Sequence, residues 1–190
     1  MPHCCGGARR RRVSLLRDTH WTPAGTAAAA FSAPSRAALV RSGVGEQQFA
    51  TVVQGEVVHH DDLMPFLTLA GRARERFGPE LVRREATSPL AVAPTSGSAL
   101  LATPSILVAL VGTSYSADPL WNFAGALQVE LAADVLVVAA EGCGPFLALQ
   151  EYLASPTFAE LPPALVIWEI PERYLSLDLG SGASVTQAEK

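Results

Sequence analysis

The sequence predicts an α/β fold in which a parallel sheet is covered by helices on both faces. Three segments of strand length are apolar at nearly every position, which is typical of strands buried on both sides. Segments of helical length separate these strands, as crossover helices do between parallel strands. The chain has 190 residues, 49% of them hydrophobic, and a mean hydropathy of +0.24. This composition excludes a disordered or fibrous chain and is sufficient for one domain with a full core.

Local signals set the elements of the first half. Thr22-Pro23, an N-cap followed by proline, starts an alanine-rich stretch, and Pro34 divides that stretch into two helices. A run rich in β-branched residues then indicates a strand, or a hairpin around Gly55. The expected elements are helices within 22–42, a strand or hairpin over 48–60, a helix over 63–77 and a loose stretch over 87–98.

The second half is more regular. Two amphipathic segments alternate with the three apolar ones, and no internal repeat is present. We therefore expect strands over 105–111, 134–140 and 164–170, and helices over 119–131 and 145–154.

The charge is unevenly distributed along the chain. The formal net charge is −4, but residues 1–17 hold five arginines and no acid, so residues 18–190 carry 9 basic and 18 acidic groups, a net of −9. Such an acidic body repels a phosphate backbone, which argues against a nucleic-acid partner. We expect a disordered basic tail over 1–17, one domain over 18–178 and a disordered tail over 179–190.

Cysteines, histidines and apolar runs exclude several other classes. The three cysteines form neither a zinc pattern nor a disulfide framework, and Cys143 is expected to be a small packed residue. His59 and His60, followed by two aspartates, are interpreted as a solvated strand end, so we expect no metal site. No apolar run is long enough to span a bilayer, and no apolar stretch before Asp18 forms a secretory signal.

Chemistry-bearing residues follow each of the three predicted parallel strands. Ligands of parallel α/β sheets bind beyond the carboxyl ends of the strands. Ser114 lies on a glycine-preceded turn into a helix, a position that exposes its hydroxyl and offers backbone N–H groups to an oxyanion. Glycine turns of this kind more often only cap a helix. The other two loops contain Gly142 and Gly144, and a polar cluster from Glu169 to Tyr174.

A carboxylate and a histidine lie just before the first helix. Asp18 and His20 are spaced i, i+2, which in an extended segment directs both side chains the same way. A carboxylate beside a histidine fixes the tautomer and leaves the other ring nitrogen free to take a proton from a serine. Alternatively, Asp18 caps the helix and His20 packs locally.

Five motifs together indicate a family. They are Asp-Thr-His-Trp-Thr-Pro-Ala-Gly at residues 18–25, Gly-Thr-Ser-Tyr-Ser at 112–116, Asp-Pro-Leu-Trp-Asn-Phe-Ala-Gly at 118–125, Glu-Gly-Cys-Gly-Pro-Phe at 141–146 and Ile-Trp-Glu-Ile-Pro-Glu-Arg-Tyr-Leu at 167–175. From about residue 18 to residue 175 the chain resembles the SGNH hydrolase-like catalytic domain of the alginate O-acetyltransferase family, the AlgX and AlgJ proteins. The resemblance implies a three-layer, flavodoxin-like SGNH fold, here N-terminally truncated. It also implies a periplasmic enzyme of alginate biosynthesis that acetylates hydroxyls of an exopolysaccharide.

The resemblance also implies roles for individual residues. Ser114 matches the nucleophile, His20 its base and Asp18 the residue that orients the base, with no cofactor required. We place Arg173 and Tyr174 at the rim, against an anionic, hydroxyl-rich substrate. The candidate oxyanion donors are the amides of Ser114 and of Gly142 or Gly144, together with the Asn122 side chain, which could equally serve in capping. The asparagine that completes the oxyanion hole in SGNH enzymes has no evident counterpart after the third strand, where Glu169 stands.

Three functions stay open at this level. The first is an acyltransferase with an acetyl donor, a polysaccharide acceptor and other exopolysaccharide-assembly proteins as partners. The second is a carbohydrate acetyl-esterase that uses the same triad with water as acceptor. The third is a non-catalytic, truncated paralogue that only binds polysaccharide or proteins, in which residues 1–17 are a substitute or misread start. The intact triad residue types argue against this third reading.

Overall fold

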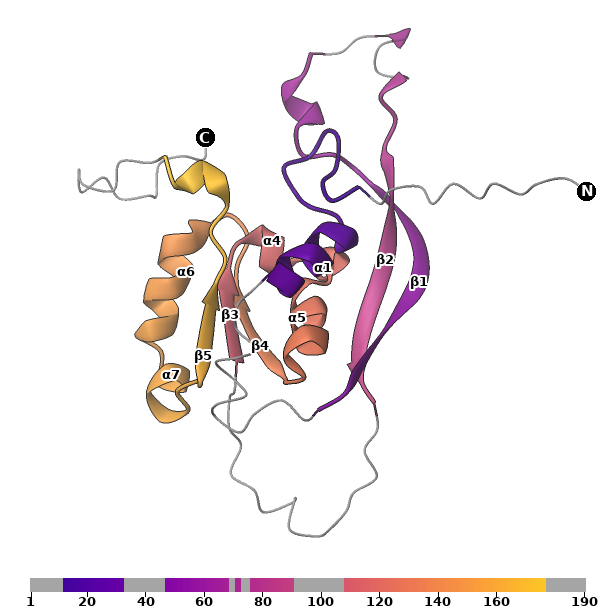
Figure 1. Cartoon of the computed structure of the whole chain (residues 1–190). Coiled ribbons are helices and arrows are strands. Elements are labelled where there is room, and N and C mark those ends of the chain that lie inside the picture. The colour runs from indigo at the N-terminus through magenta and orange to yellow at the C-terminus, as the bar shows by residue number, and fades with distance from the viewer. Residues whose placement is uncertain (1–11, 33–46, 69–70, 73–75, 91–107, 177–190) are drawn as a thin grey trace, which may run out of the picture.

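A three-stranded parallel sheet forms the centre of the computed structural model, which describes residues 12–32, 47–68, 71–72, 76–90 and 108–176. Its strand order is β4-β3-β5 (Figure 1). The strands are β3 (Val108–Gly112), β4 (Val135–Ala139) and β5 (Leu165–Trp168). Both neighbours pair in parallel with β3, which is buried along its whole length. The sequence-predicted parallel sheet is therefore confirmed, with β3 as its buried centre.

Helices cover both faces of this sheet. On one face α1 (Pro23–Ser32) and α5 (Phe123–Leu131) pack against Val108 and Leu110. On the other face α6 (Gly144–Leu153) and α7 (Pro156–Glu160) pack against Ala109 and Val111. Alternate residues of β3 thus supply two separate apolar cores, because successive strand side chains point to opposite faces. The expected three-layer arrangement is present (Figure 1).

An antiparallel ribbon forms a further layer beside α5. It consists of β1 (Phe49–His59) and β2 (Glu80–Pro89), and both strands contact α5. The run around Gly55 is one strand with an irregularity between Val53 and Gly55, so the hairpin alternative is wrong. β2 was not expected from the sequence, because its Arg- and Glu-containing pattern lacks the apolar alternation of a half-buried strand.

Several expected helices are shorter than predicted. The helix expected over 63–77 is interrupted, because η1 (Met64–Phe66) is a single 3-10 turn and Leu67 is extended. The helix expected over 119–131 divides into η3 (Pro119–Trp121) and α5 at Asn122, whose φ is 51°. The first helix ends at Ser32 within the described residues, so the expected division at Pro34 lies outside them, as does most of the loose stretch over 87–98.

Part of the expected basic tail belongs to the fold. Ser14 pairs with Trp21 in an antiparallel bridge, and Thr22 N–H donates to the Val13 carbonyl at 3.1 Å. Gly25 is required here because a Cβ at that position would overlap the Val13 carbonyl oxygen. The expectation of disorder is therefore wrong for residues 12–17, whereas 1–11 and the expected tail over 179–190 lie outside the described residues.

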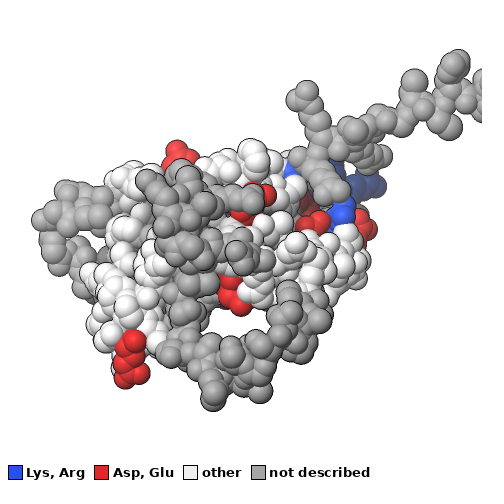
Figure 2. Space-filling view, turned by 60° about the horizontal axis from the view of Figure 1, so that its bottom comes forward, with Lys and Arg blue, Asp and Glu red and all other residues white. Residues whose placement is uncertain are grey.

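The surface of the described residues bears on the expectations for Cys143 and for the distribution of charge. Cys143 is exposed at the start of α6, so the expectation of a packed cysteine is wrong. Figure 2 shows one face on which most described residues are uncharged, acidic side chains are scattered and basic ones gather at one side. No helix in the described part of the chain is long and apolar enough to cross a membrane.

Candidate active site

The turn after β3 presents Ser114 at the start of a short helix, α4 (Ser114–Ala117). Glu169, which follows β5, holds this turn: its Oε2 accepts from Thr113 N–H at 2.8 Å, Thr113 Oγ1 at 3.0 Å and Ser116 Oγ at 3.2 Å. A Cβ at Gly112 would lie 2.5 Å from the same oxygen, so only glycine allows this approach. The carboxylate at the end of one strand therefore fixes the serine turn at the end of its neighbour.

Glu169 is thus expected to stabilise the turn rather than to take part in chemistry. We predict that Glu169→Ala lowers the free energy of unfolding by about 2 kcal/mol, because it leaves buried donors of Thr113 and Ser116 without a partner. Urea unfolding of both proteins measures this loss. Glu172→Ala, at an exposed carboxylate nearby, is the control and should change stability little. Equal losses in the two variants would contradict the role given to Glu169.

Asp18 and His20 meet through a bend of the backbone. The His20 N–H donates to Asp18 Oδ1 at 2.8 Å, the i to i+2 bond of an Asx turn. Residues 16–20 form bends, so the expectation of an extended segment is wrong. The backbone bond brings the two side chains together, because it curls the chain around the carboxylate.

The three residues of the proposed triad form a continuous chain of hydrogen bonds. His20 Nδ1 lies 2.6 Å from Asp18 Oδ1, and His20 Nε2 lies 2.8 Å from Ser114 Oγ. An ionised Asp18 only accepts, so Nδ1 carries the proton and the Nε2 lone pair faces the Ser114 hydroxyl. The His20 ring stacks on the buried Trp121 ring at 5.1 Å between centroids, which keeps the imidazole in this orientation. The geometry is that of a serine nucleophile with its general base.

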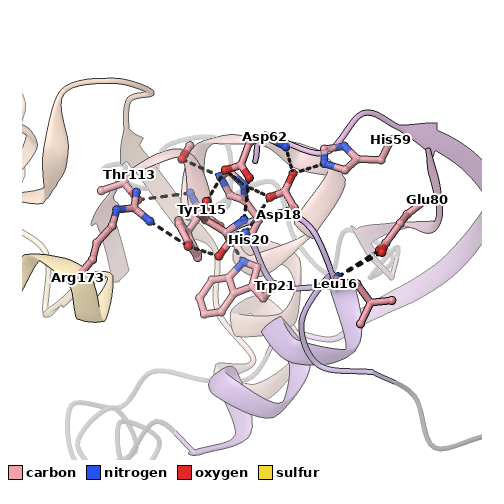
Figure 3. Close-up of polar contacts among 12 residues, drawn as sticks. Leu16, Asp18, His20, Trp21, His59, Asp62, Glu80, Thr113, Tyr115 and Arg173 are labelled. Carbon is pink, nitrogen blue, oxygen red and sulfur yellow. Dashed lines mark hydrogen bonds and ion pairs between the residues drawn. The ribbon is translucent and has the colours of Figure 1, made fainter. Parts of the chain in front are cut away.

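The Asp18 carboxylate is buried and fully bonded. Besides the two His20 bonds to Oδ1, its Oδ2 accepts from His59 Nε2 at 2.7 Å and from the Asp62 N–H at 2.8 Å (Figure 3). Burial alone raises the pKa of Asp18, but the hydrogen bonds from His59, His20 and Asp62 outweigh it and lower that pKa to about 2. His59 and Asp62 were not expected at the site. The interpretation of the His-His-Asp-Asp run as a solvated strand end is wrong for His59, because the end of β1 brings this side chain to Asp18.

This lowered pKa predicts a specific acid sensitivity. The group's pKa in the folded chain, about 2, lies below its ordinary value of 3.8. The stabilisation is therefore present above about pH 4 and is lost as pH falls toward about 2, and it amounts to about 2 kcal/mol. Urea unfolding at several pH values should show this loss in the unmodified protein and not in Asp18→Asn, where the position cannot titrate. An equal loss in both proteins would assign the acid sensitivity to other groups.

The predicted rim residues lie next to the serine turn. Arg173 donates from Nη1 to Tyr115 Oη at 3.1 Å, and Tyr115 donates to the Thr19 carbonyl (Figure 3). The Arg173 guanidinium also lies over the rings of Tyr115 and Tyr174, at 5.4 and 5.1 Å from their centroids. Burial lowers the pKa of Arg173, yet the two tyrosines raise it overall, so this exposed group is a permanent cation beside the proposed nucleophile.

The candidate oxyanion donors differ in their hydrogen-bond partners and in their position around the serine turn. The Ser114 N–H has no hydrogen-bond partner among the described residues. Gly142 and Gly144 both have positive φ, in the turn after β4, and Gly144 lies against the Tyr174 ring. The Asn122 amide instead donates to Thr87 Oγ1 at 3.0 Å, on β2. This bond favours the structural alternative for Asn122, which joins α5 to the ribbon.

A group of acidic and imidazole ligands also occurs within the site. One ligand atom each of Asp18, His20 and Asp62 lies within 4.8 Å of the others. Such a set can in principle hold a small cation, but here His20 Nδ1 is already bonded to Asp18. Asp62 in turn accepts from the Thr19 N–H at 2.9 Å. The hydrogen-bond pattern therefore assigns these groups to orienting the Asp18–His20 pair.

Comparisons with known proteins show what this chain is similar to as a whole. Residues 6–172 match the family model described as "SGNH hydrolase-like domain, acetyltransferase AlgX". The chain is 42% identical over 178 residues to a probable alginate O-acetylase AlgJ of Pseudomonas putida and 41% identical over 173 residues to that of Pseudomonas syringae pv. tomato. These alignments cover 90% and 89% of this chain. They cover 46% and 44% of the relatives, so the chain spans about half the length of the curated relatives it matches.

Two solved structures share the fold. The O-acetyltransferase domain of Pseudomonas putida AlgJ matches with a TM-score of 0.70 and 37% identity, over 90% of this chain and 58% of that one. Pseudomonas aeruginosa AlgX matches with a TM-score of 0.66 and 27% identity, over 87% of this chain and 38% of that one. Both similarities extend over most of the chain.

Proposed function

The chain belongs to the AlgX family of SGNH hydrolase-like acetyltransferases, and on this premise we propose that it transfers acetyl groups through Ser114 to hydroxyls of an alginate-like polysaccharide. The observation that carries the proposal is the continuous hydrogen-bond chain from Ser114 through His20 to Asp18. The named activity of the AlgJ relatives supplies the reaction class.

The first half-reaction forms an acetyl-serine. His20 Nε2 takes the Ser114 hydroxyl proton while Oγ attacks the carbonyl carbon of an acetyl donor. The bond from this carbon to the donor's leaving atom then breaks, and the proton on His20 passes to that atom. Asp18 stabilises the imidazolium between the two proton transfers without taking the proton itself.

The second half-reaction returns the serine. A sugar hydroxyl gives its proton to His20 Nε2 and attacks the acetyl-serine carbonyl, and the proton then passes to Ser114 Oγ as its bond to the acetyl group breaks. In both halves the tetrahedral oxyanion requires N–H donors. The Ser114 N–H, which has no partner among the described residues, is the first donor in our proposal, and a Gly142 or Gly144 amide is the second.

Arg173 is our candidate contact for the acceptor. Uronate polysaccharides carry one carboxylate per sugar, and a guanidinium is well suited to bind a carboxylate. Arg173 lies against Tyr115, the residue after the proposed nucleophile, and also lies over the Tyr174 ring, whose hydroxyl is a further polar group at the rim. Because the body of the chain is acidic overall, this local cation would have to supply the attraction for a polyanionic acceptor.

Our proposal extends to the location and partners of the protein. We place the protein in the periplasm, where it would work with other proteins of exopolysaccharide assembly. The support is the name of the relatives as alginate O-acetylases.

One experiment distinguishes the functions left open by the sequence. The protein and its Ser114→Ala variant are given a chromogenic acetyl ester, with and without polymannuronate, and both chromophore release and polymer acetylation are measured. Serine-dependent transfer to the polymer supports the proposal. Serine-dependent release without transfer identifies an esterase instead, and the absence of serine-dependent release points to a binding protein. A neutral glucan as acceptor tests whether the uronate carboxylates are needed.

A further inference from the structure

His59, the last residue of β1, is not a member of the proposed triad but contacts one of its residues, Asp18. Its Nε2 lies 2.7 Å from Asp18 Oδ2, the oxygen that His20 does not use. The side chain is 18% exposed, and its ring stands edge-on to Trp121 at 5.2 Å between centroids. The same Trp121 ring stacks on His20, so one buried indole packs against both imidazoles.

The carboxylate between the two histidines has no spare acceptor position. Each Asp18 oxygen accepts two N–H groups: Oδ1 from the His20 ring and backbone, and Oδ2 from His59 and the Asp62 backbone. A carboxylate offers about four lone-pair positions, so every position is occupied. Removing the His59 donor leaves one acceptor position of a buried carboxylate oxygen unsatisfied, so that the Asp62 N–H alone holds Oδ2.

We propose that His59 is a positioning residue of the acyl-transfer site: by donating its Nε2–H to Asp18, it fixes this carboxylate against His20 and tempers the basicity of His20. The inference rests on the proposed function of Ser114. β1 ends at His59, and this strand end brings the donor to the triad. The site is then a four-residue chain of Ser114, His20, Asp18 and His59.

Removal of His59 changes proton binding at His20 in the same direction whether His59 is neutral or protonated. In either state His59 donates a hydrogen bond from Nε2–H to Asp18, and this bond draws negative charge away from the carboxylate. Its removal leaves more charge on Asp18 to stabilise the His20 imidazolium, which favours the protonated form of His20. Two further acidic residues lie near this chain of bonds. Glu80 is the register partner of His59 on β2, and Asp62 Oδ2 lies 3.7 Å from His20 Nδ1.

Four variants of the full chain test the proposal. His59→Ala removes the donor, His59→Gln keeps an N–H donor at a similar reach, and His59→Asn carries the same amide on a side chain one methylene shorter. His60→Ala is the matched control, because this neighbouring histidine is exposed and contacts none of the triad residues in the described structure.

The readouts separate positioning from simple destabilisation. For His59→Ala we expect kcat/KM to fall about tenfold and the acid limb of its pH profile to move upward by about half a pH unit. His59→Gln should restore both, and His60→Ala should change neither. NMR titration of the His20 ring should show the same upward shift in His59→Ala, and it needs no substrate. If His59→Ala does not fold, the comparison of His59→Gln with His59→Asn replaces it, with the shift expected in Asn only.

Failure of this inference can be told apart from failure of the proposed function. Unchanged His20 titration in a folded His59→Ala or His59→Asn overturns the inference, whatever the activity. A shift that His59→Gln does not restore also overturns it, since the N–H donor would then not be the cause. If the unmodified protein shows no Ser114-dependent reaction, the proposed function fails, while the titration still decides the role of His59.

Discussion

Ser114→Ala is expected to abolish acetyl transfer, with a loss of about 10³-fold or more in kcat/KM. The reason is covalent: the alanine methyl has no oxygen to attack the donor, so no acetyl-enzyme forms. The variant should fold normally, because Ser114 Oγ bonds to His20 and the turn is held by Thr113 and Glu169. Initial rates with an acetyl ester measure the loss.

Mass spectrometry gives an independent test of this intermediate. The unmodified protein, quenched during turnover, should gain one acetyl group on the peptide that contains Ser114, and Ser114→Ala should gain none there. Ser32→Ala, at an exposed serine at the end of α1, is the control and should keep full activity. A Ser114→Ala variant that keeps more than a few per cent of the activity would show that another group carries the acetyl transfer.

Asp18→Asn is expected to cost about 10⁴-fold in kcat, although it changes few atoms. The carboxylate accepts four N–H groups, whereas an asparagine side chain offers one oxygen and an NH₂ group that donates. When that NH₂ faces His20, the imidazole must accept at Nδ1 and hold its proton on Nε2. His20 then no longer accepts the Ser114 proton.

The measurement is a single-turnover rate at about pH 7, where Asp18 is ionised in the unmodified protein. Asp61→Asn, which alters the neighbouring carboxylate that pairs with Arg17, is the matched control for lost charge. It should lower stability more than rate, because Asp61 has no contact with the triad among the described interactions. Similar losses of rate in the two variants would contradict a tautomer-fixing role for Asp18.

Local patterns were sufficient for the elements that are buried on both faces. The three apolar runs became β3, β4 and β5, because continuous apolar sequence of that length has few other stable placements. Thr22-Pro23 marked the start of α1, where Thr22 Oγ1 accepts from the Gly25 N–H at 3.2 Å. The ribbon was harder to find. β1 was expected from its β-branched residues, but β2 was not, because its polar pattern is weak and its pairing partner lies far away in the chain.

The same contrast applies to the candidate site. Short motifs were enough to assign the fold class, the family and the candidate residues Asp18, His20 and Ser114. The contacts of Glu169 with the serine turn and of His59 with Asp18, by contrast, are apparent only in the folded arrangement. These partners lie 56 and 41 positions apart in the chain. No local pattern encodes such contacts, since the packing of β5 and of the ribbon brings them together.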